Sequence, residues 1–255
     1  FLNSMKVISY NINGIRAAIK KGLINWLKEI DADVICFQEI KANKDQFDDD
    51  LFIDLGYHCY WYSAEKKGYS GVAILCKKKP IKVTYGIKNS LIDSEARVLK
   101  IEYENLGIYS VYFPSGSSGP IRQEFKMFFL NKFMNYIKNE TQTTLISGDF
   151  NICHKSIDIH DPIRNKNSSG FLEVERKWVT NFLKSGFVDS FREKNKLPNN
   201  YSWWSYRARS RERNKGWRID YHMISHAFLD KIKEAKILSN IKHSDHCPIY
   251  LELSL

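Results

Sequence analysis

Short hydrophobic runs, separated by polar or glycine-containing segments, recur along the whole chain and predict buried β-strands. They cover residues 7–10, 33–37, 72–76, 98–103, 107–112, 144–147, 219–225 and 248–253. The runs at 98–103 and 107–112 flank Glu104 and Asn105, which predicts a β-hairpin.

Three other segments carry hydrophobic residues at helical spacing. We predict helices over 22–30, 121–138 and 173–183, with these inward positions: Leu23, Trp26, Leu27 and Ile30; Phe125, Phe128, Phe129, Phe133 and Ile137; Val174, Trp178 and Phe182. Strands and helices mix without strict β-α-β alternation, which favours an α+β arrangement over a doubly wound sheet. The two strand-rich halves suggest two packed sheets with helices outside.

The composition fits one domain without a membrane segment. A chain of 255 residues that is 43% hydrophobic can bury one sizeable core, and no linker divides residues 5–255. No stretch approaches the roughly 20 apolar residues that span a bilayer, and no signal-peptide pattern opens the chain. We therefore expect a soluble, cytoplasmic protein, and we expect Phe1 to Ser4, ahead of Met5, to be a cloning remnant.

Basic residues outnumber acidic ones. Lys and Arg total 39 against 29 Asp and Glu, a net charge of +10 at pH 7. This excess favours a polyanionic partner, either nucleic acid or an anionic membrane surface. A lysine-rich surface that serves only solubility explains the charge equally well. The net charge alone therefore does not distinguish a polyanion-binding protein from an ordinary soluble one.

Polar residues follow several predicted strands, at the points where a strand delivers side chains to the edge of a sheet. They are Asn11, Glu39, Asp149 with Asn151, Asp220, and Asp245 with His246. Carboxylate oxygens favour magnesium or manganese, and a histidine can act as acid, base or electrophile, so the set suits phosphate-ester hydrolysis. The five cysteines show no CxxC spacing, which argues against a structural zinc site or a disulfide framework.

Most of these motifs also have a simpler structural explanation. Residues 11–14 are typical of a turn, Glu39 could be a surface residue, and Tyr112 could belong to the core. The segment from Asp149 to Asn151 is more specific, because an extended chain would place the carboxylate and the amide on the same side. Its alternative is a turn capped by the aspartate side chain.

Aromatic and arginine residues gather between Tyr201 and Tyr221. Rings that stack on bases and guanidinium groups that contact phosphates are what a nucleic-acid groove needs. A core aromatic cluster beside a solvated basic loop is the alternative.

With these motifs in order, the chain resembles the exonuclease III family of abasic-site DNA endonucleases, within the endonuclease/exonuclease/phosphatase superfamily. The resemblance runs from Ser9 to Leu253 and rests on these segments: Asn11-x-Asn13-Gly14-x-Arg16, Gln38-Glu39, Gly68-Tyr69-Ser70-Gly71-Val72, Tyr112-x-Pro114, Gly148-Asp149-x-Asn151, Gly216-Trp217-Arg218-x-Asp220-Tyr221 and Ser244-Asp245-His246.

The resemblance implies a DNase-I-like α/β fold, a four-layered sandwich of two packed mixed β-sheets flanked by helices. It also implies a monomeric base-excision-repair nuclease that uses Mg²⁺ or Mn²⁺. Such an enzyme cleaves double-stranded DNA 5′ to abasic sites and removes 3′-blocking groups or 3′ nucleotides.

The resemblance further implies roles in metal binding and in generating the nucleophile. Glu39 resembles the principal metal ligand, with Asn11 and Asp245 completing or supporting the site. Asp149 resembles the residue that positions and deprotonates the attacking water.

Other residues resemble groups that contact the substrate. Tyr112 and Asn151 match the groups that hold the scissile phosphate, and His246, oriented by Asp220, matches the residue that hydrogen-bonds a phosphate oxygen. The resemblance leaves open which group protonates the leaving oxygen.

The positions expected to contact DNA depart from the family in two places. Ser115 stands where relatives carry a longer amide, and the following residues 116–119 are glycine- and serine-rich. Arg207 occupies a position that can be apolar in relatives, which makes contact with the duplex more electrostatic. Trp203 and Trp217 are expected around a pocket for the abasic sugar.

Two other functions stay open. A superfamily phosphodiesterase or phosphatase with a non-DNA substrate would share the acidic framework, and a non-catalytic nucleic-acid-binding module would share the surface. The net charge and the Trp- and Arg-rich segment 203–218 argue against the first, and the intact polar set argues against the second. The sequence does not rank the endonuclease, exonuclease and 3′-phosphatase activities.

Overall fold

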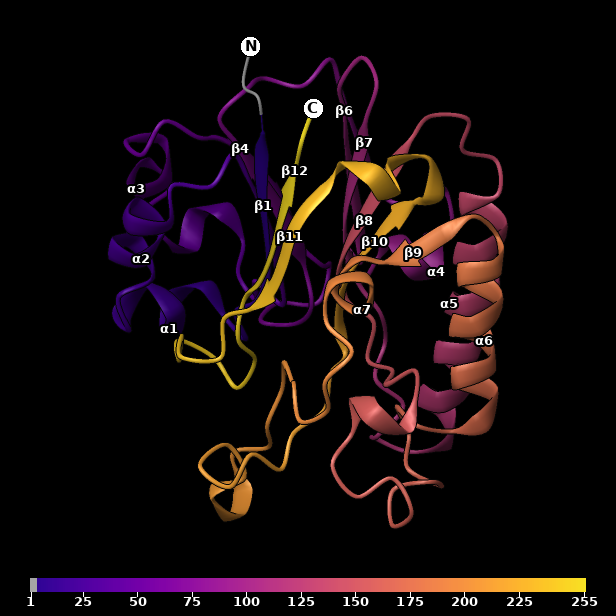
Figure 1. Cartoon of the computed structure of the whole chain (residues 1–255). Coiled ribbons are helices and arrows are strands. Elements are labelled where there is room, and N and C mark those ends of the chain that lie inside the picture. Colours follow the sequence, from indigo (N-terminus) through magenta and orange to yellow (C-terminus); the bar gives the residue numbers. More distant parts are fainter. Residues whose placement is uncertain (1–3) are drawn as a thin grey trace.

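Two six-stranded β-sheets pack face to face at the centre of the protein (Figure 1). The computed structural model describes residues 4–255, so the expectation for Phe1 to Asn3 lies outside the described residues. In sheet order, the first sheet contains β11 (Ile232–Ile237), β12 (Ile249–Leu253), β1 (Met5–Asn11), β2 (Val34–Gln38), β4 (Val72–Cys76) and β3 (His58–Tyr62). The second contains β5 (Lys82–Tyr85), β6 (Val98–Glu102), β7 (Gly107–Tyr112), β8 (Thr144–Asp149), β10 (Asp220–Ser225) and β9 (Phe187–Asp189).

Helices cover the outer faces of both sheets and complete four layers (Figure 1). The first sheet carries α1 (Ile15–Lys20), α2 (Leu23–Ile30) and α3 (Asp50–Ile53), and the second carries α5 (Pro120–Ile137) and α6 (Glu173–Lys184). The remaining helices are short: α4 (Ser90–Asp93), α7 (Ser190–Lys194), and the 3₁₀ turns η1 (Lys44–Gln46), η2 (Ser156–Asp158), η3 (Arg207–Arg209) and η4 (His226–Lys231). This architecture confirms the predicted mixed, four-layered sandwich. Among the described residues, no helix combines the length and the apolar character needed to cross a membrane.

The predicted strands are confirmed, and the four that the sequence analysis missed are the edge strands β3, β5, β9 and β11. Central strands such as β2 and β4 are buried along their whole length, so they appear as continuous hydrophobic runs. The edge strands contain exposed or half-buried positions, which weakens that signal.

The predicted inward face of α6 is wrong at its first position. Val174 is 51% exposed, whereas Glu175 is fully buried together with Val179 and Phe182. Glu175 is drawn inward by the Nζ of Lys126 on α5, 2.7 Å from its Oε1, and it also accepts the backbone N–H of Gly170. A buried ion pair therefore sets the orientation that hydrophobic periodicity alone misassigned.

Strand register brings the polar strand ends into one row. Tyr112 of β7 is paired with Asp149 of β8, and Asp149 is paired with Asp220 of β10. In the first sheet Asn11 is paired with Gln38, and Glu39 follows directly. Both sheets thus present polar side chains at the same rim of the sandwich.

Buried hydrogen bonds also link the two sheets beneath this rim. His222 of β10 donates from Nε2 to the carbonyl of Ile249 in β12 at 3.2 Å, and its Nδ1 lies 2.8 Å from the Ser147 hydroxyl. The carbonyl can only accept, so Nε2 carries a proton, and in the neutral ring Nδ1 then accepts from the Ser147 hydroxyl. Burial lowers the pKa of His222 to about 4.

We predict that His222 makes stability fall in mild acid. Its pKa is about 6.5 in the unfolded chain and about 4 in the fold, so the unfolded state binds an extra proton as pH falls from about 6.5 toward 4. The loss approaches about 3 kcal/mol at about 1.36 kcal/mol per pKa unit. Urea unfolding measures the free energy of unfolding of the wild type and of His222→Gln. Between about pH 6.5 and pH 4 this free energy should fall more steeply for the wild type than for His222→Gln. Parallel pH profiles would contradict the prediction.

Candidate active site

Most of the predicted site residues line one cleft at the shared rim of the two sheets, with a volume of about 490 Å³. They are Glu39, Tyr112, Ser115, Asp149, Asn151, Trp203, Trp217, Asp245 and His246. Asn11 and Asp220 lie buried beneath it and hydrogen-bond to its lining, while Arg207 is exposed on a separate loop. Another cleft, of about 480 Å³ between segments 199–214 and 237–242, contains none of the predicted catalytic groups.

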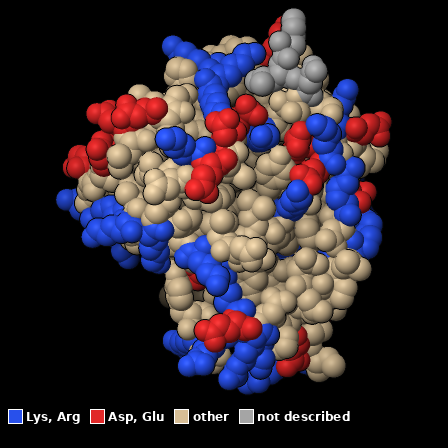
Figure 2. All heavy atoms as spheres, turned by 60° about the vertical axis from the view of Figure 1, so that its left-hand side comes forward, with Lys and Arg blue, Asp and Glu red and all other residues tan. Residues whose placement is uncertain are grey.

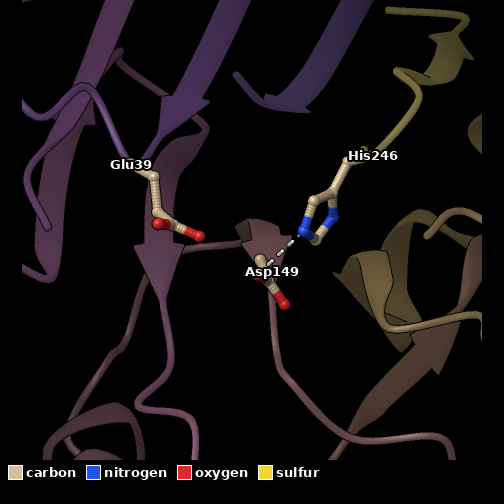
Figure 3. Close-up of side chains that lie close together, drawn as sticks. All are labelled: Glu39, Asp149 and His246. Atoms are coloured by element: carbon tan, nitrogen blue, oxygen red, sulfur yellow. Dashed lines mark ion pairs between the residues drawn. The ribbon is translucent and has the colours of Figure 1, made fainter. Parts of the chain in front are cut away.

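Glu39, Asp149 and His246 form the closest group in the cleft. One ligand atom from each lies within 4.8 Å of the others, and Figure 3 shows the three side chains pointing toward one another. Glu39 follows β2, Asp149 ends β8 and His246 lies in the loop before β12. The amide nitrogen of Asn11 donates to Glu39 Oε1 at 2.8 Å and to Asp149 Oδ2 at 2.9 Å. Asn11 therefore bridges carboxylates that belong to different sheets.

His246 lies between two aspartates. Its Nδ1 is 2.9 Å from Asp220 Oδ2, and its Nε2 is 3.8 Å from Asp149 Oδ2. Burial disfavours the charged ring, but Asp220 and then Asp149 outweigh it and raise the pKa of His246 to about 10. Below that pH the imidazolium donates from both nitrogens, toward Asp220 on one side and into the cleft on the other.

The pKa of Asp149 is raised to about 7 by burial and by the neighbouring charge of Asp220, with His246 opposing the rise. Near neutral pH this carboxyl group can therefore both accept and release a proton. Its geometry places it next to the space that a substrate would occupy.

Asn151 reaches the cleft through a turn, which corrects the expectation of an extended chain. Its φ of 50° is left-handed, and its backbone N–H donates to Asp149 Oδ1 at 2.8 Å. This is the aspartate-capped turn that the sequence left as an alternative. The turn nevertheless brings the Asn151 amide nitrogen to 3.3 Å from Asp149 Oδ2. The turn therefore places the Asn151 amide beside the Asp149 carboxylate, as the extended chain had been expected to do.

Asp245 is held apart from the closest group by other partners. Asn13 Nδ2 donates to its Oδ1 at 3.0 Å, and the Trp203 indole donates to its Oδ2 at 2.9 Å. Burial opposes ionisation, but His246 and these donors keep the pKa of Asp245 below its usual range. Asp245 is thus an ionised carboxylate whose oxygens are already hydrogen-bonded.

The aromatic wall of the cleft comes from two segments that pair with each other. Trp203 and Trp217 exchange backbone hydrogen bonds of 2.9 Å, and their rings meet edge to face with centroids 5.9 Å apart. Tyr112 lines the cleft from β7, next to Asp149 of β8; burial and then Glu39 raise its pKa, so it is a neutral donor. Ser115 hydrogen-bonds to Ser117 through their hydroxyls at 2.9 Å.

Sequence reasoning gave no role to Lys41 and Asn13. Lys41 Nζ is 2.9 Å from Glu39 Oε2 and also donates to Asn13 Oδ1 at 2.5 Å. Asn13 lies inside the motif that begins at Asn11, and Lys41 lies two residues after Glu39, so their positions near Asn11 and Glu39 were the available signal.

The donor set fits a divalent cation. The carboxylates of Glu39, Asp149 and Asp220 have two cationic partners, Lys41 at Glu39 and His246 between the aspartates, and Asp220 Oδ1 is buried without a hydrogen-bond partner among the described residues. The pKa of Asp149 is raised first by burial and then by the neighbouring negative charge of Asp220. Carboxylate oxygens are the ligands that hard divalent cations prefer, and Glu39 presents one beside Asp149 and His246.

Comparisons with known proteins agree with this geometry. The model of the endonuclease/exonuclease/phosphatase family matches residues 8–246. The chain is 42% identical over 255 residues to an exodeoxyribonuclease of Bacillus subtilis, covering 98% of this chain and 100% of that one. An AP endonuclease structure from Archaeoglobus fulgidus superposes with a TM-score of 0.89 at 27% identity, covering 98% of this chain and all of that one. The structure of the 3′ phosphatase NExo from Neisseria, bound to a product DNA hairpin, superposes with a TM-score of 0.90 at 26% identity. This match covers 98% of this chain and all of that one.

We predict that His246 in the metal-free protein stays protonated through neutral pH and that Asp220→Asn lowers its pKa, because Asp220 is the main source of the rise. NMR titration of the histidine ring signals, with His246 assigned by substitution, measures both values. A wild-type His246 that titrates near its ordinary pKa of 6.5 would contradict the assignment.

Proposed function

The chain belongs to the endonuclease/exonuclease/phosphatase family, and we propose that it is a metal-dependent DNA repair nuclease. It hydrolyses the phosphodiester 5′ to abasic sites in double-stranded DNA and removes 3′-blocking groups or 3′ nucleotides. The observation that carries the proposal is the cleft itself, in which Glu39, Asp149 and His246 lie beside an apolar wall of two tryptophans. Exodeoxyribonuclease, AP endonuclease and 3′ phosphatase relatives support it.

The proposed mechanism divides the work among residues of both sheets. Asp149 orients the attacking water and takes its proton, for which a pKa of about 7 is well matched. His246, protonated and held by Asp220, donates toward a phosphate oxygen as negative charge grows there. Tyr112 and Asn151 face the same space and hold the phosphate.

Glu39, supported by Asn11 and Asp245, would hold the cation, and Mg²⁺ or Mn²⁺ suits these oxygen ligands. A bound divalent cation supplies charge neutralisation for the phosphate oxygens.

The surface favours a long polyanion over a small substrate. Figure 2 shows Lys and Arg gathered at the lower end of the molecule, where segment 199–217 projects in Figure 1. Arg207, Arg209 and Arg213 of this segment are exposed. Exposed cations on this projecting segment can contact phosphates along a duplex and position the target phosphodiester.

The proposal is tested with three end-labelled duplexes: one intact, one with a tetrahydrofuran abasic analogue and one with a 3′-phosphate. We predict cleavage with Mg²⁺ or Mn²⁺ and none with EDTA, and Glu39→Ala should require a much higher metal concentration. Full activity in EDTA, or rescue by zinc alone, would refute the metal assignment. Inactivity on all three duplexes, with hydrolysis of a small phosphodiester, would favour the non-DNA alternative.

We predict that Asp149→Asn and His246→Ala each lower kcat by roughly 10² to 10⁴, the range for a positioned base or charge-stabilising donor, with little change in DNA affinity. The control is His222→Gln. His222 is also a buried histidine, but it does not line the cleft. Near-normal kcat in His246→Ala would show that this residue is structural.

We predict that Trp203→Ala narrows the preference for abasic over intact DNA. The Trp203–Trp217 wall accepts a sugar without a base and excludes a whole nucleotide by volume, and extrusion costs least where no pairing is lost. The ratio of abasic to intact cleavage is measured alongside thermal melting. An unchanged ratio in a well-folded variant would mean that the tryptophans only pack.

A further inference from the structure

Arg97 contacts Tyr112 in three ways although it lies outside the cleft. Arg97 directly precedes β6 and Tyr112 ends the neighbouring strand β7: the Tyr112 N–H donates to the Arg97 carbonyl at 2.9 Å, and Arg97 Nη1 donates to the Tyr112 carbonyl at 2.9 Å. The guanidinium carbon also lies 4.6 Å from the centre of the Tyr112 ring. One buried side chain therefore contacts both the backbone and the ring of a cleft residue.

The rest of the guanidinium is held by partners that give it a fixed orientation. Its Nε lies 2.6 Å from Glu95 Oε2, and its Nη2 donates to the Tyr69 hydroxyl at 3.1 Å. Arg122 binds the same two partners from the other side, Glu95 at 2.8 Å and the Tyr69 hydroxyl at 2.9 Å. With a relative exposure of 1%, Arg97 cannot reach a DNA phosphate.

From this arrangement we propose that Arg97 is a positioning residue for Tyr112, and that the Tyr69 hydroxyl and Glu95 hold Arg97 in place. The inference rests on the proposed function, in which Tyr112 holds the scissile phosphate. A planar guanidinium that is hydrogen-bonded along its edge restricts the ring stacked on its face, and the cation–π contact adds attraction. It also gives a role to Tyr69, which lies in one of the segments that carry the family resemblance and had no role assigned from the sequence.

The same pair of strands provides a matched control. Lys100 of β6 lies 5.3 Å above the ring of Tyr109 of β7, and its Nζ pairs with Glu140 at 2.6 Å. Lys100 is buried like Arg97, but neither Lys100 nor Tyr109 lines the cleft. Loss of Lys100 removes a comparable buried cation from a tyrosine that does not contact the proposed substrate.

The experiment is a double-mutant cycle on the full chain with the tetrahydrofuran duplex and Mg²⁺. The variants are Arg97→Met, Tyr112→Phe, the double variant and Lys100→Met, and kcat, KM and urea unfolding are measured for each. We expect Arg97→Met and Tyr112→Phe each to lower kcat by roughly 10², as for loss of one transition-state donor, with smaller changes in KM. The double variant should lose no further kcat, while its unfolding free energy falls further. Lys100→Met should lose stability and keep kcat.

Two outcomes would overturn the proposal: multiplicative kcat losses in the double variant, or wild-type kcat in Arg97→Met. If Arg97→Met does not fold, Arg97→Lys replaces it in the same cycle, because it keeps the charge and removes the planar fork.

A readout independent of activity separates this inference from the proposed function. Ring ¹³C signals of Tyr112, assigned with Tyr112→Phe, should shift more in Arg97→Met than in Lys100→Met. Equal shifts would overturn the positioning role even if the wild type cleaved no DNA. A wild type that cleaves no duplex while the Tyr112 signals shift as expected would refute only the proposed function.

Discussion

Two carboxylates from different sheets, Glu39 and Asp149, accept hydrogen bonds from the same amide nitrogen, that of Asn11, and the geometry of the cleft depends on this contact. Like charges this close repel strongly where water is largely excluded. Asn11 offsets the repulsion as a donor, with Lys41 at 2.9 Å from Glu39 on one side and His246 near Asp149 on the other. Because Asn11 is fully buried and paired in register with Gln38, the bridge is fixed by the strands.

The negative charge that remains in the cleft favours binding of a divalent cation. Burial and the charge of Asp220 raise the pKa of Asp149, and a divalent cation bound in the cleft would offset the remaining negative charge. The same cation can offset the charge of an incoming phosphodiester. An acidic cleft is compatible with a net charge of +10 under the proposed function, because the basic surface would attract a polyanion while the cleft would hold the metal.

The outer layers contribute to the site as well as covering the sheets. Lys126 on α5 is fully buried, pairs with Glu175 on α6 and donates to the Asn151 carbonyl at 2.8 Å. Glu175 in turn holds the backbone of Gly170, which lines the cleft. Replacing one partner of such a pair leaves an uncompensated buried charge, so the helices and the cleft are linked energetically. The Arg97 cluster makes a similar connection from the other side, through Tyr112.

The sequence alone determined the central strands, the three long helices and the polar residues that end the strands. Buried strands require continuous apolar runs, helices require periodic ones, and the motifs between them identify the family. The sequence did not reveal the edge strands β3, β5, β9 and β11, because half-exposed strands lack a continuous apolar run. Only the tertiary structure decided that Glu175 faces inward in place of Val174 and that Asp245 is held by Asn13 and Trp203. These outcomes depend on partners distant in sequence, whose charges and hydrogen bonds meet only when the two sheets pack.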